Sequence, residues 1–400
     1  MDRFSEQDRL LKPSGADRER ATILRAMRAI WISWLLAVST YAVAQSSAPA
    51  QTPWQMQESG TTASLRGIDS VDGTIAWASG TGGTVLKTID GGVHWTACAI
   101  PDAATDGATL DFRGVQAWDA ETTIVMASGP GDKSRLYKTT DGCKTWALLF
   151  KNPNTPDGFF DSFWINPAYN EGVLLGDPVK NSFVVFETSD AGATWHRDNS
   201  KGLEMGSKPI AGFAASNSLV ARFAAGYSHG FVTGGKGGAF LVHKWGTRYW
   251  SRSTIPLTSG TDASGAFSLG YRVTPPPCTD CSGPFYQFTV AVGGDYTRPN
   301  DSTGTAAWSS DGGKSWTAST TQPHGYRSSV QWSGSIGQFD DRTPAWIAVG
   351  TNGSDISRDD GKTWQPIDNG NWNALSLPFV VGPNGRIARL NPEALPHSAP

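Results

Sequence analysis

One eight-residue pattern recurs along the chain at nearly constant spacing and constrains the fold more than any other feature. The pattern, Ser/Thr-x-Asp-x-Gly-x-x-Trp, starts at Thr88, Thr188, Ser309 and Ser357, and a fifth copy with cysteine in place of the glycine starts at Thr139. Successive aspartates are 51, 49, 121 and 48 residues apart. Regular self-similarity over about 50 residues indicates a repeat architecture. The long gap therefore predicts one degenerate copy, which we place at Phe240–Trp250.

The residue types of the pattern favour a tight turn between two strands. A short carboxylate accepts hydrogen bonds from backbone N–H groups of its own turn, and glycine adopts the positive φ that such turns require. The tryptophan starts the next strand and buries a large surface against a neighbouring hairpin. We therefore assign a structural role, and no catalytic one, to Asp90, Trp95, Asp141, Trp146, Asp190, Trp195, Asp311, Trp316, Asp359 and Trp364.

The segments before each copy of the pattern look like further strands. Ser64–Ile68 and Asp111–Val115 are short candidate inner strands, and apolar strands closing in glycine follow, as in Ala76–Gly80. The closing glycines, at positions 80, 129, 176, 234, 293, 350 and 382, count seven units. The last unit lacks a fourth strand, which Trp54–Gln57 supplies from the N-terminal side. We predict an all-β, seven-bladed β-propeller of four-stranded blades closed by its N- and C-terminal strands, with six blades as the runner-up. The 46 glycines and 24 prolines fit such a turn-rich fold.

The N-terminal part has a different character. Residues 29–44 form an uncharged apolar run that ends Ala42-Val43-Ala44, preceded by Met27 and Arg28. This pattern is typical of a signal peptide. We divide the chain into an extension and signal peptide (1–44), a linker (45–53), the propeller (54–390) and a tail (391–400). An uncleaved membrane anchor is the alternative. We expect export, to the periplasm or the exterior.

These repeats and several shorter motifs resemble those of a known protein family. The repeated pattern is similar to the bacterial neuraminidase (Asp-box) repeat. Together with Phe112-Arg-Gly114, Gly176-Asp-Pro-Val179, Phe213-Ala-Ala-Ser-Asn217 and Gly293-Gly-Asp-Tyr296, the layout resembles the photosystem II stability/assembly factors. The resemblance covers residues 54–390. It implies an exported, non-catalytic propeller that binds a protein partner, an envelope or membrane protein, through an arginine-rich patch.

Propeller topology gathers a second set of residues on the face opposite the repeated turns. The inner strands contribute Arg66, Arg113, Asp161 and Arg327, and the turns contribute Asp132, Asp177, Lys236, Asp295, Tyr296 and Arg298. Arginines near the axis are suited to binding carboxylates or carbonyl groups of a partner. Alternatively, the three arginines of the inner strands form ion pairs with Asp161, Asp177 and Asp295 and fill a narrow channel along the axis.

A third interpretation is a sialidase-like glycoside hydrolase or a carbohydrate-binding propeller for acidic sugars. Sialidases use three arginines and a tyrosine nucleophile on this face, and Arg66, Arg113 and Arg327 with Tyr296 or Tyr326 imitate that set. The Arg-Ile-Pro signature of sialidases is absent, however. Activity as an enzyme stays open, with no catalytic residue assigned.

The remaining residues predict neither a cofactor nor a metal. The histidines lack paired ligand spacing. A formal net charge of −3 argues against nucleic-acid binding. Of four cysteines, Cys278 and Cys281 lie close together in a proline-rich insertion. In an exported protein we expect these two to form a local disulfide, and the state of Cys98 and Cys143 stays open.

Overall fold

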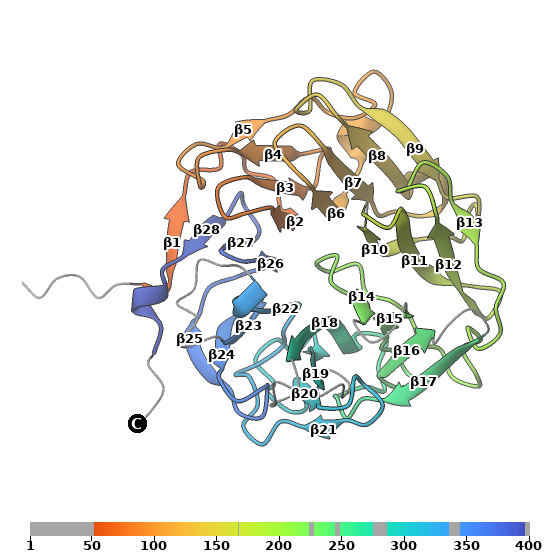
Figure 1. Ribbon diagram of the computed structural model, residues 1–400, viewed down its shortest axis with the longest axis vertical. Helices are drawn as coiled ribbons and strands as arrows, with labels where there is room; N and C mark the ends of the chain where they lie inside the picture. Colours follow the sequence, from red (N-terminus) through yellow and green to blue (C-terminus); the bar gives the residue numbers. More distant parts are fainter. Residues whose placement is uncertain are drawn as a thin grey trace, which may run out of the picture. The chain divides into compact units, whose positions relative to one another are not determined.

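The computed structural model describes residues 52–166, 168–223, 228–244, 249–274, 286–335 and 345–396. From Gln51 to Pro400 the chain forms one compact unit. In it, seven sheets of four antiparallel strands stand in a ring, which is the predicted seven-bladed β-propeller (Figure 1). No helix within the described residues is long and apolar enough to cross a membrane.

The first four blades each contain four consecutive strands, ordered from the axis outward. Blade 1 consists of β2 (Leu65–Ser70), β3 (Ala76–Gly80), β4 (Val85–Thr88) and β5 (Thr96–Ala97). Blade 2 consists of β6 (Phe112–Ala117), β7 (Thr123–Ala127), β8 (Arg135–Thr139) and β9 (Ala147–Lys151). Blade 3 consists of β10 (Phe160–Asn166), β11 (Glu171–Val179), β12 (Ser182–Thr188) and β13 (His196–Arg197). Blade 4 consists of β14 (Val220–Phe223), β15 (Ser228–Val232), β16 (Phe240–Lys244) and β17 (Trp250–Thr254).

The last three blades complete the ring. Blade 5 consists of β18 (Ser264–Thr274), β19 (Tyr286–Asp295), β20 (Ala306–Ser309) and β21 (Thr317–Ala318). Blade 6 consists of β22 (Ser329–Trp332), β23 (Trp346–Gly350), β24 (Gly353–Ser357) and β25 (Gln365–Asp368). Blade 7 consists of β26 (Ala374–Ser376), β27 (Phe379–Val381), β28 (Ile387–Leu390) and β1 (Trp54–Gln57). Short 3₁₀ turns lie at Gly107–Thr109, Gly131–Lys133, Ser333–Ser335 and Pro392–Ala394.

The ring is closed by the two ends of the propeller, as predicted. Strand β1 pairs antiparallel with β28, from Trp54 opposite Leu390 to Gln57 opposite Ile387. The outer strand of blade 7 therefore comes from the N-terminal side, and Figure 1 shows β1 beside β28. The Trp54 ring also packs against the ring of Trp372, with centroids 6.0 Å apart. This closure pairs the strand edges that an open sheet would leave exposed.

Polar side chains on or just before the inner strands join neighbouring blades around the axis. Each accepts a hydrogen bond from a backbone N–H of the next or previous blade at 2.7–2.9 Å. The pairs, acceptor first, are Asp69 with Ala117, Gln116 with Ile165, Asn217 with Phe163, Ser268 with Val330, Gln331 with Leu377, and Ser376 with Ser70. These bonds satisfy inner-strand N–H groups that have no further strand to pair with.

The repeated motif forms the same turn in all five copies, between the third and fourth strands of a blade. The hydroxyl of its first residue donates to the aspartate Oδ1 at 2.7–2.9 Å. The same hydroxyl accepts the N–H of the motif's fifth residue at 2.8–3.0 Å. The aspartate Oδ1 also accepts the N–H of the residue before the tryptophan, at 2.8–3.0 Å. The carboxylates thus hold their own turns, as the motif predicted.

The motif tryptophans reach back to the preceding blade. Trp95 packs on Phe379 of blade 7 with ring centroids 5.7 Å apart, and its Nε1 donates to Gln57 at 3.0 Å. Trp146 Nε1 donates to the Ala99 carbonyl of blade 1 at 2.8 Å. In the degenerate copy, Phe240 and Trp250 lie on β16 and β17, the third and fourth strands of blade 4, as expected. The turn between these strands, residues 245–248, lies outside the described residues.

Candidate binding site

A β-bulge at the start of the inner strand recurs in four blades and aims one side chain at the axis. Pairing of the first two strands shifts at Arg66 in β2, Arg113 in β6, Asp161 in β10 and Phe267 in β18. A bulge adds one residue to a strand and turns its side chain away from the regular alternation. The first three of these residues were predicted from the sequence, and Phe267 was missed.

These side chains line one cavity of about 510 Å³. Because consecutive strands run antiparallel, the inner strands start on the face opposite the repeated turns. The cavity is lined by Arg66, Arg113, Phe159, Asp161, Asp177, Gly212, Phe213, Ala214, Ala215, Phe267, Tyr296, Tyr326, Ser328, Thr351 and Asn373. The structure thus brings together five predicted residues, namely Arg66, Arg113, Asp161, Asp177 and Tyr296.

The two arginines differ in how they are held. Arg113 Nε donates to Asp111 Oδ2 at 2.7 Å, and its Nη1 donates to the Ala214 carbonyl at 3.3 Å. Arg66 Nε is buried and has no hydrogen-bond partner among the described residues. Burial and the nearby charge of Arg113 lower the pKa of Arg66 below its usual value. Since a buried donor without an acceptor is costly, Arg66 is suited to bind an acceptor on a ligand.

Two carboxylates from blade 3 face the arginines. Asp161 is only 1% exposed, and its Oδ2 has no hydrogen-bond partner among the described residues. Burial, reinforced by repulsion from Asp177, raises the pKa of Asp161 well above its usual value. Asp177 Oδ1 accepts the Gly212 N–H at 3.2 Å, and burial raises the pKa of Asp177 to about 6. The two groups are therefore prone to hold a proton near neutral pH.

Aromatic rings form the other side of the cavity. Phe213 and Phe267 are stacked with centroids 3.9 Å apart, and Tyr326 contacts Phe267 edge-on at 4.8 Å. Tyr296, 51% exposed, lies edge-on to both phenylalanines, at 6.5 and 6.1 Å. The site combines charge on blades 1–3 with an aromatic wall from β18, the segments before β14 and β22, and the turn after β19.

The prediction that Arg327 lies with the other two arginines is wrong. Arg327 is 0% exposed, and its Nε donates to the equally buried Asp355 at 2.6 Å. Gly350 packs against the backbone of Tyr326 and Arg327 in the way that Gly80 packs against Ser64 and Leu65. Arg327 therefore corresponds to Leu65, one position before the bulge, and points into the blade. Its neighbour Ser328 lines the cavity instead.

The remaining predicted residues lie outside the cavity lining. Lys236 forms an exposed ion pair with Asp262 at 2.5 Å. Asp295, 4% exposed, accepts hydrogen bonds from the N–H and hydroxyl of Thr297 at 3.0 and 2.6 Å. Asp132 lies 3.6 Å from Lys151, and Arg298 lies 3.1 Å from Asp301. These four side chains are held by partners of their own.

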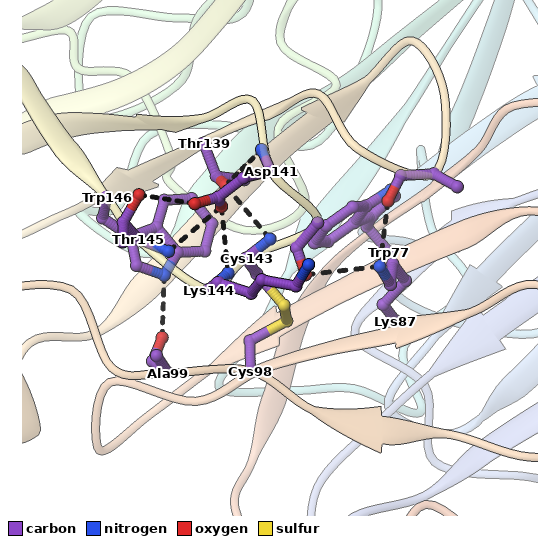
Figure 2. The surroundings of a disulfide bond; sticks show 12 residues. Trp77, Lys87, Cys98, Ala99, Thr139, Asp141, Cys143, Lys144, Thr145 and Trp146 are labelled. Carbon is purple, nitrogen blue, oxygen red and sulfur yellow. Dashed lines mark hydrogen bonds between the residues drawn. A yellow bond between two sulfur atoms is a disulfide. The ribbon is translucent and has the colours of Figure 1, made fainter.

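A disulfide joins Cys98 of blade 1 to Cys143 of blade 2, which the sequence left open (Figure 2). Cys143 occupies the motif position that holds glycine in the other copies, and it keeps the positive φ of that position, 67°. Its N–H still donates to the Thr139 hydroxyl at 3.0 Å, so the substitution preserves the turn. The predicted bond between Cys278 and Cys281 lies outside the described residues.

Within the described ranges, no group of three or more His, Cys, Asp or Glu side chains is placed to hold a metal ion.

Comparison with known proteins gives one relative in sequence. No protein-family model matches the chain. A segment of 149 residues, 36% of this chain, is 26% identical to the photosystem II assembly lipoprotein Ycf48 of Synechococcus sp. (strain CC9902). The match spans 40% of that relative's length.

Solved structures give the same resemblance over most of the chain. YCF48 from Cyanidioschyzon merolae is 17% identical, with a TM-score of 0.53 over 86% of this chain and 100% of its own. A structure of YCF48 bound to a D1 peptide matches equally, over 98% of its own chain. The WD40 propeller domain of Doa1, 9% identical, has a TM-score of 0.51 over 85% of this chain and 98% of its own. The resemblance to photosystem II assembly-factor propellers is thus confirmed as a likeness in sequence and fold.

Proposed function

We propose that this propeller binds a segment of a protein partner in the cavity formed by Arg66, Arg113, Asp161, Asp177 and Tyr296, and that it acts as an assembly or stability factor and not as an enzyme. The observation that carries the proposal is the buried Nε of Arg66, which has no acceptor among the described residues. An acidic group on the partner supplies that acceptor, and guanidinium–carboxylate bonds are among the strongest hydrogen bonds in proteins. The aromatic wall receives an apolar neighbour of that group.

The relatives support a peptide as the ligand. One structural neighbour is YCF48 bound to a D1 peptide, and the sequence relative is an assembly lipoprotein of photosystem II. By analogy, we propose a membrane or envelope protein as the partner here. The analogy extends to the mode of binding and carries no implication of photosynthesis.

A carbohydrate-directed function has weaker support. The cavity offers two arginines and not three, and none of its lining residues is a glutamate. Hydrolysis of a fluorogenic sialoside that is lost in an Asp161→Asn variant would favour this alternative.

We further propose that the protein is exported with residues 1–44 as its signal peptide. That segment lies outside the described residues. The Cys98–Cys143 disulfide supports the proposal, because such bonds persist in oxidising compartments. Intact-mass measurement of the native protein should give an N-terminus near Gln45, and a mature N-terminus at Met1 would contradict export.

The binding proposal is tested by affinity purification from envelopes of the native host with quantitative mass spectrometry. A partner recovered with the wild type should be depleted with an Arg66→Met variant. It should be retained with Asp262→Asn, a charge change at an exposed pair outside the cavity. Equal recovery with all three proteins argues against the cavity as the binding site.

A further inference from the structure

If every titratable group at the cavity is ionised, the cavity carries more negative than positive charge and repels an anion. Its lining holds two guanidinium groups, Arg66 and Arg113, and two carboxylates, Asp161 and Asp177. Asp111 adds a third carboxylate, bound to Arg113. The other titratable lining groups are the phenols of Tyr296 and Tyr326. An anionic ligand at Arg66 would meet the repulsion of three carboxylates against the attraction of two arginines.

The position of the blade 3 carboxylates suggests how this repulsion is relieved. Both carboxylates lie next to Gly212. Asp177 Oδ1 accepts the N–H of Gly212, and a Cβ placed on Gly212 would lie only 2.6 Å from Asp161 Oδ2. Neither Asp161 nor Asp177 forms an ion pair within the described ranges, because Arg113 forms its ion pair with Asp111. Asp161 is buried and Asp177 is half-buried, and two neighbouring carboxylates without a counter-ion are most stable when they share a proton.

We propose that Asp161 and Asp177 share one proton, and that the protonated carboxyl donates a hydrogen bond to an anionic group bound beside Arg66. One proton is then held in the cavity with each bound anion. This inference rests on the proposed function and specifies the chemistry of the same site. The ligand's oxygen accepts one hydrogen bond from Arg66 and one from the protonated carboxyl. Above the pKa of the pair the proton comes from solvent, so the cavity then gains one proton and one negative charge together.

The raised pKa values agree with this geometry. Burial places the pKa of Asp177 at about 6, and burial together with Asp177 raises that of Asp161. Positive charge on Arg113 opposes the rise at Asp161. An anion in the cavity adds repulsion and shifts the pair further towards the protonated form. Binding should therefore weaken as the pH rises above about 6, by up to about tenfold per pH unit when one proton is coupled.

The test uses 2-phenylethanesulfonate as the probe, since its ring fits the aromatic wall and its charge does not change between pH 5 and 8. Calorimetric titration at pH 5.5 and 8.0, in buffers of different ionisation enthalpy, measures the affinity and the protons taken up. We expect binding at least about tenfold weaker at pH 8.0, with close to one proton taken up at pH 8.0 and much less at pH 5.5, where the free pair already holds its proton. Asp161→Asn/Asp177→Asn, which removes both carboxyls of the pair, should bind about equally at both pH values and take up no proton, whereas Asp262→Asn should behave as wild type.

A second measurement needs no ligand. Infrared difference spectra of the free protein between pH 5 and 8 should show, besides the protonated carboxyl band of Asp69, a second such band that is absent in Asp161→Asn/Asp177→Asn. Absence of this band from the wild type overturns the shared proton, whatever the protein binds. Sulfonate binding that is independent of pH and takes up no proton, or no sulfonate binding at any pH, overturns the coupling. Neither result bears on partner recovery in the Arg66→Met purification, which tests the proposed function separately.

Discussion

Replacing Arg327 and Arg66 separately by methionine should have opposite consequences for stability and binding. Arg327 donates to Asp355, to the Tyr326 carbonyl at 2.6 Å and to Asn352 at 2.5 Å. Arg327→Met leaves the fully buried Asp355 without its permanent cation, with only His324 Nδ1 at 2.8 Å from its Oδ1. Breaking a buried pair in this way costs about 3–5 kcal/mol.

The expected shift in melting temperature follows from the size of the propeller. Unfolding entropy near 2.1 cal/mol/K per residue gives about 0.7 kcal/mol/K for a unit of this length. Arg327→Met should therefore lower the melting temperature by about 4–7 °C. Arg66→Met removes no hydrogen bond among the described residues and relieves repulsion by Arg113, so its melting temperature should stay within about 1 °C of wild type.

Affinity for the partner should fall in Arg66→Met, which keeps its stability, and not in Arg327→Met, which loses it. Loss of a desolvated arginine at the centre of an interface costs about 2 kcal/mol or more, roughly a 30-fold loss of affinity. Calorimetry of unfolding and the affinity for the recovered partner are measured on both variants and on Arg327→Met/Asp355→Leu. The double variant should recover much of the lost stability, because no charge remains buried alone. The reasoning is refuted if Arg327→Met melts like wild type, or if Arg66→Met melts as low as Arg327→Met.

Three further predictions concern other parts of the ring. Reduction of the Cys98–Cys143 bond, which closes a loop across 45 residues, should cost about 4 kcal/mol, and unfolding curves that coincide with and without reductant would contradict this. Asp311→Ala removes the acceptor for Ser315 N–H and Ser309 Oγ and should cost about 1 kcal/mol with partner affinity unchanged; a loss of affinity at constant stability would speak against a structural role. Burial raises the pKa of Asp69 to about 6, above its unfolded value near 4, so its contribution favours the folded state less as the pH rises from 4 through 6. Asp69→Asn should accordingly flatten the fall in melting temperature between pH 4 and 7, and an unchanged slope would contradict the assignment.

The repeated motif made the fold predictable because its chemistry is local. Each aspartate holds its own turn, so five copies marked five blades without any knowledge of long-range contacts. The orphan strand at Trp54–Gln57 then indicated closure, since only one blade lacked its fourth strand. The non-local disulfide was not predictable in the same way. Cys98 and Cys143 are neighbours only because the ring places the end of one blade beside the turn of the next.

The site was predictable only where the sequence preserved the register of the inner strands. Arg66 and Arg113 each stand three residues before the polar residue that bonds to the next blade, Asp69 and Gln116. Arg327 stands four residues before Gln331, which has the same role. That one-residue offset is the signal that would have placed Ser328 at the cavity and Arg327 inside the blade. The aromatic wall had no such marker, since Phe213 and Phe267 come from blades without an arginine at the bulge.

The central claim is that the cavity receives the protein partner, and site-specific photocrosslinking in the native host tests it most directly. A photoreactive phenylalanine analogue replaces Tyr296, half-exposed at the cavity, or Val93, 71% exposed in a repeated turn on the opposite face. We expect a crosslinked partner from position 296 that disappears when Arg66→Met is added, and none from position 93. Crosslinking from position 93 alone, or crosslinking at 296 that is unaffected by Arg66→Met, would contradict it.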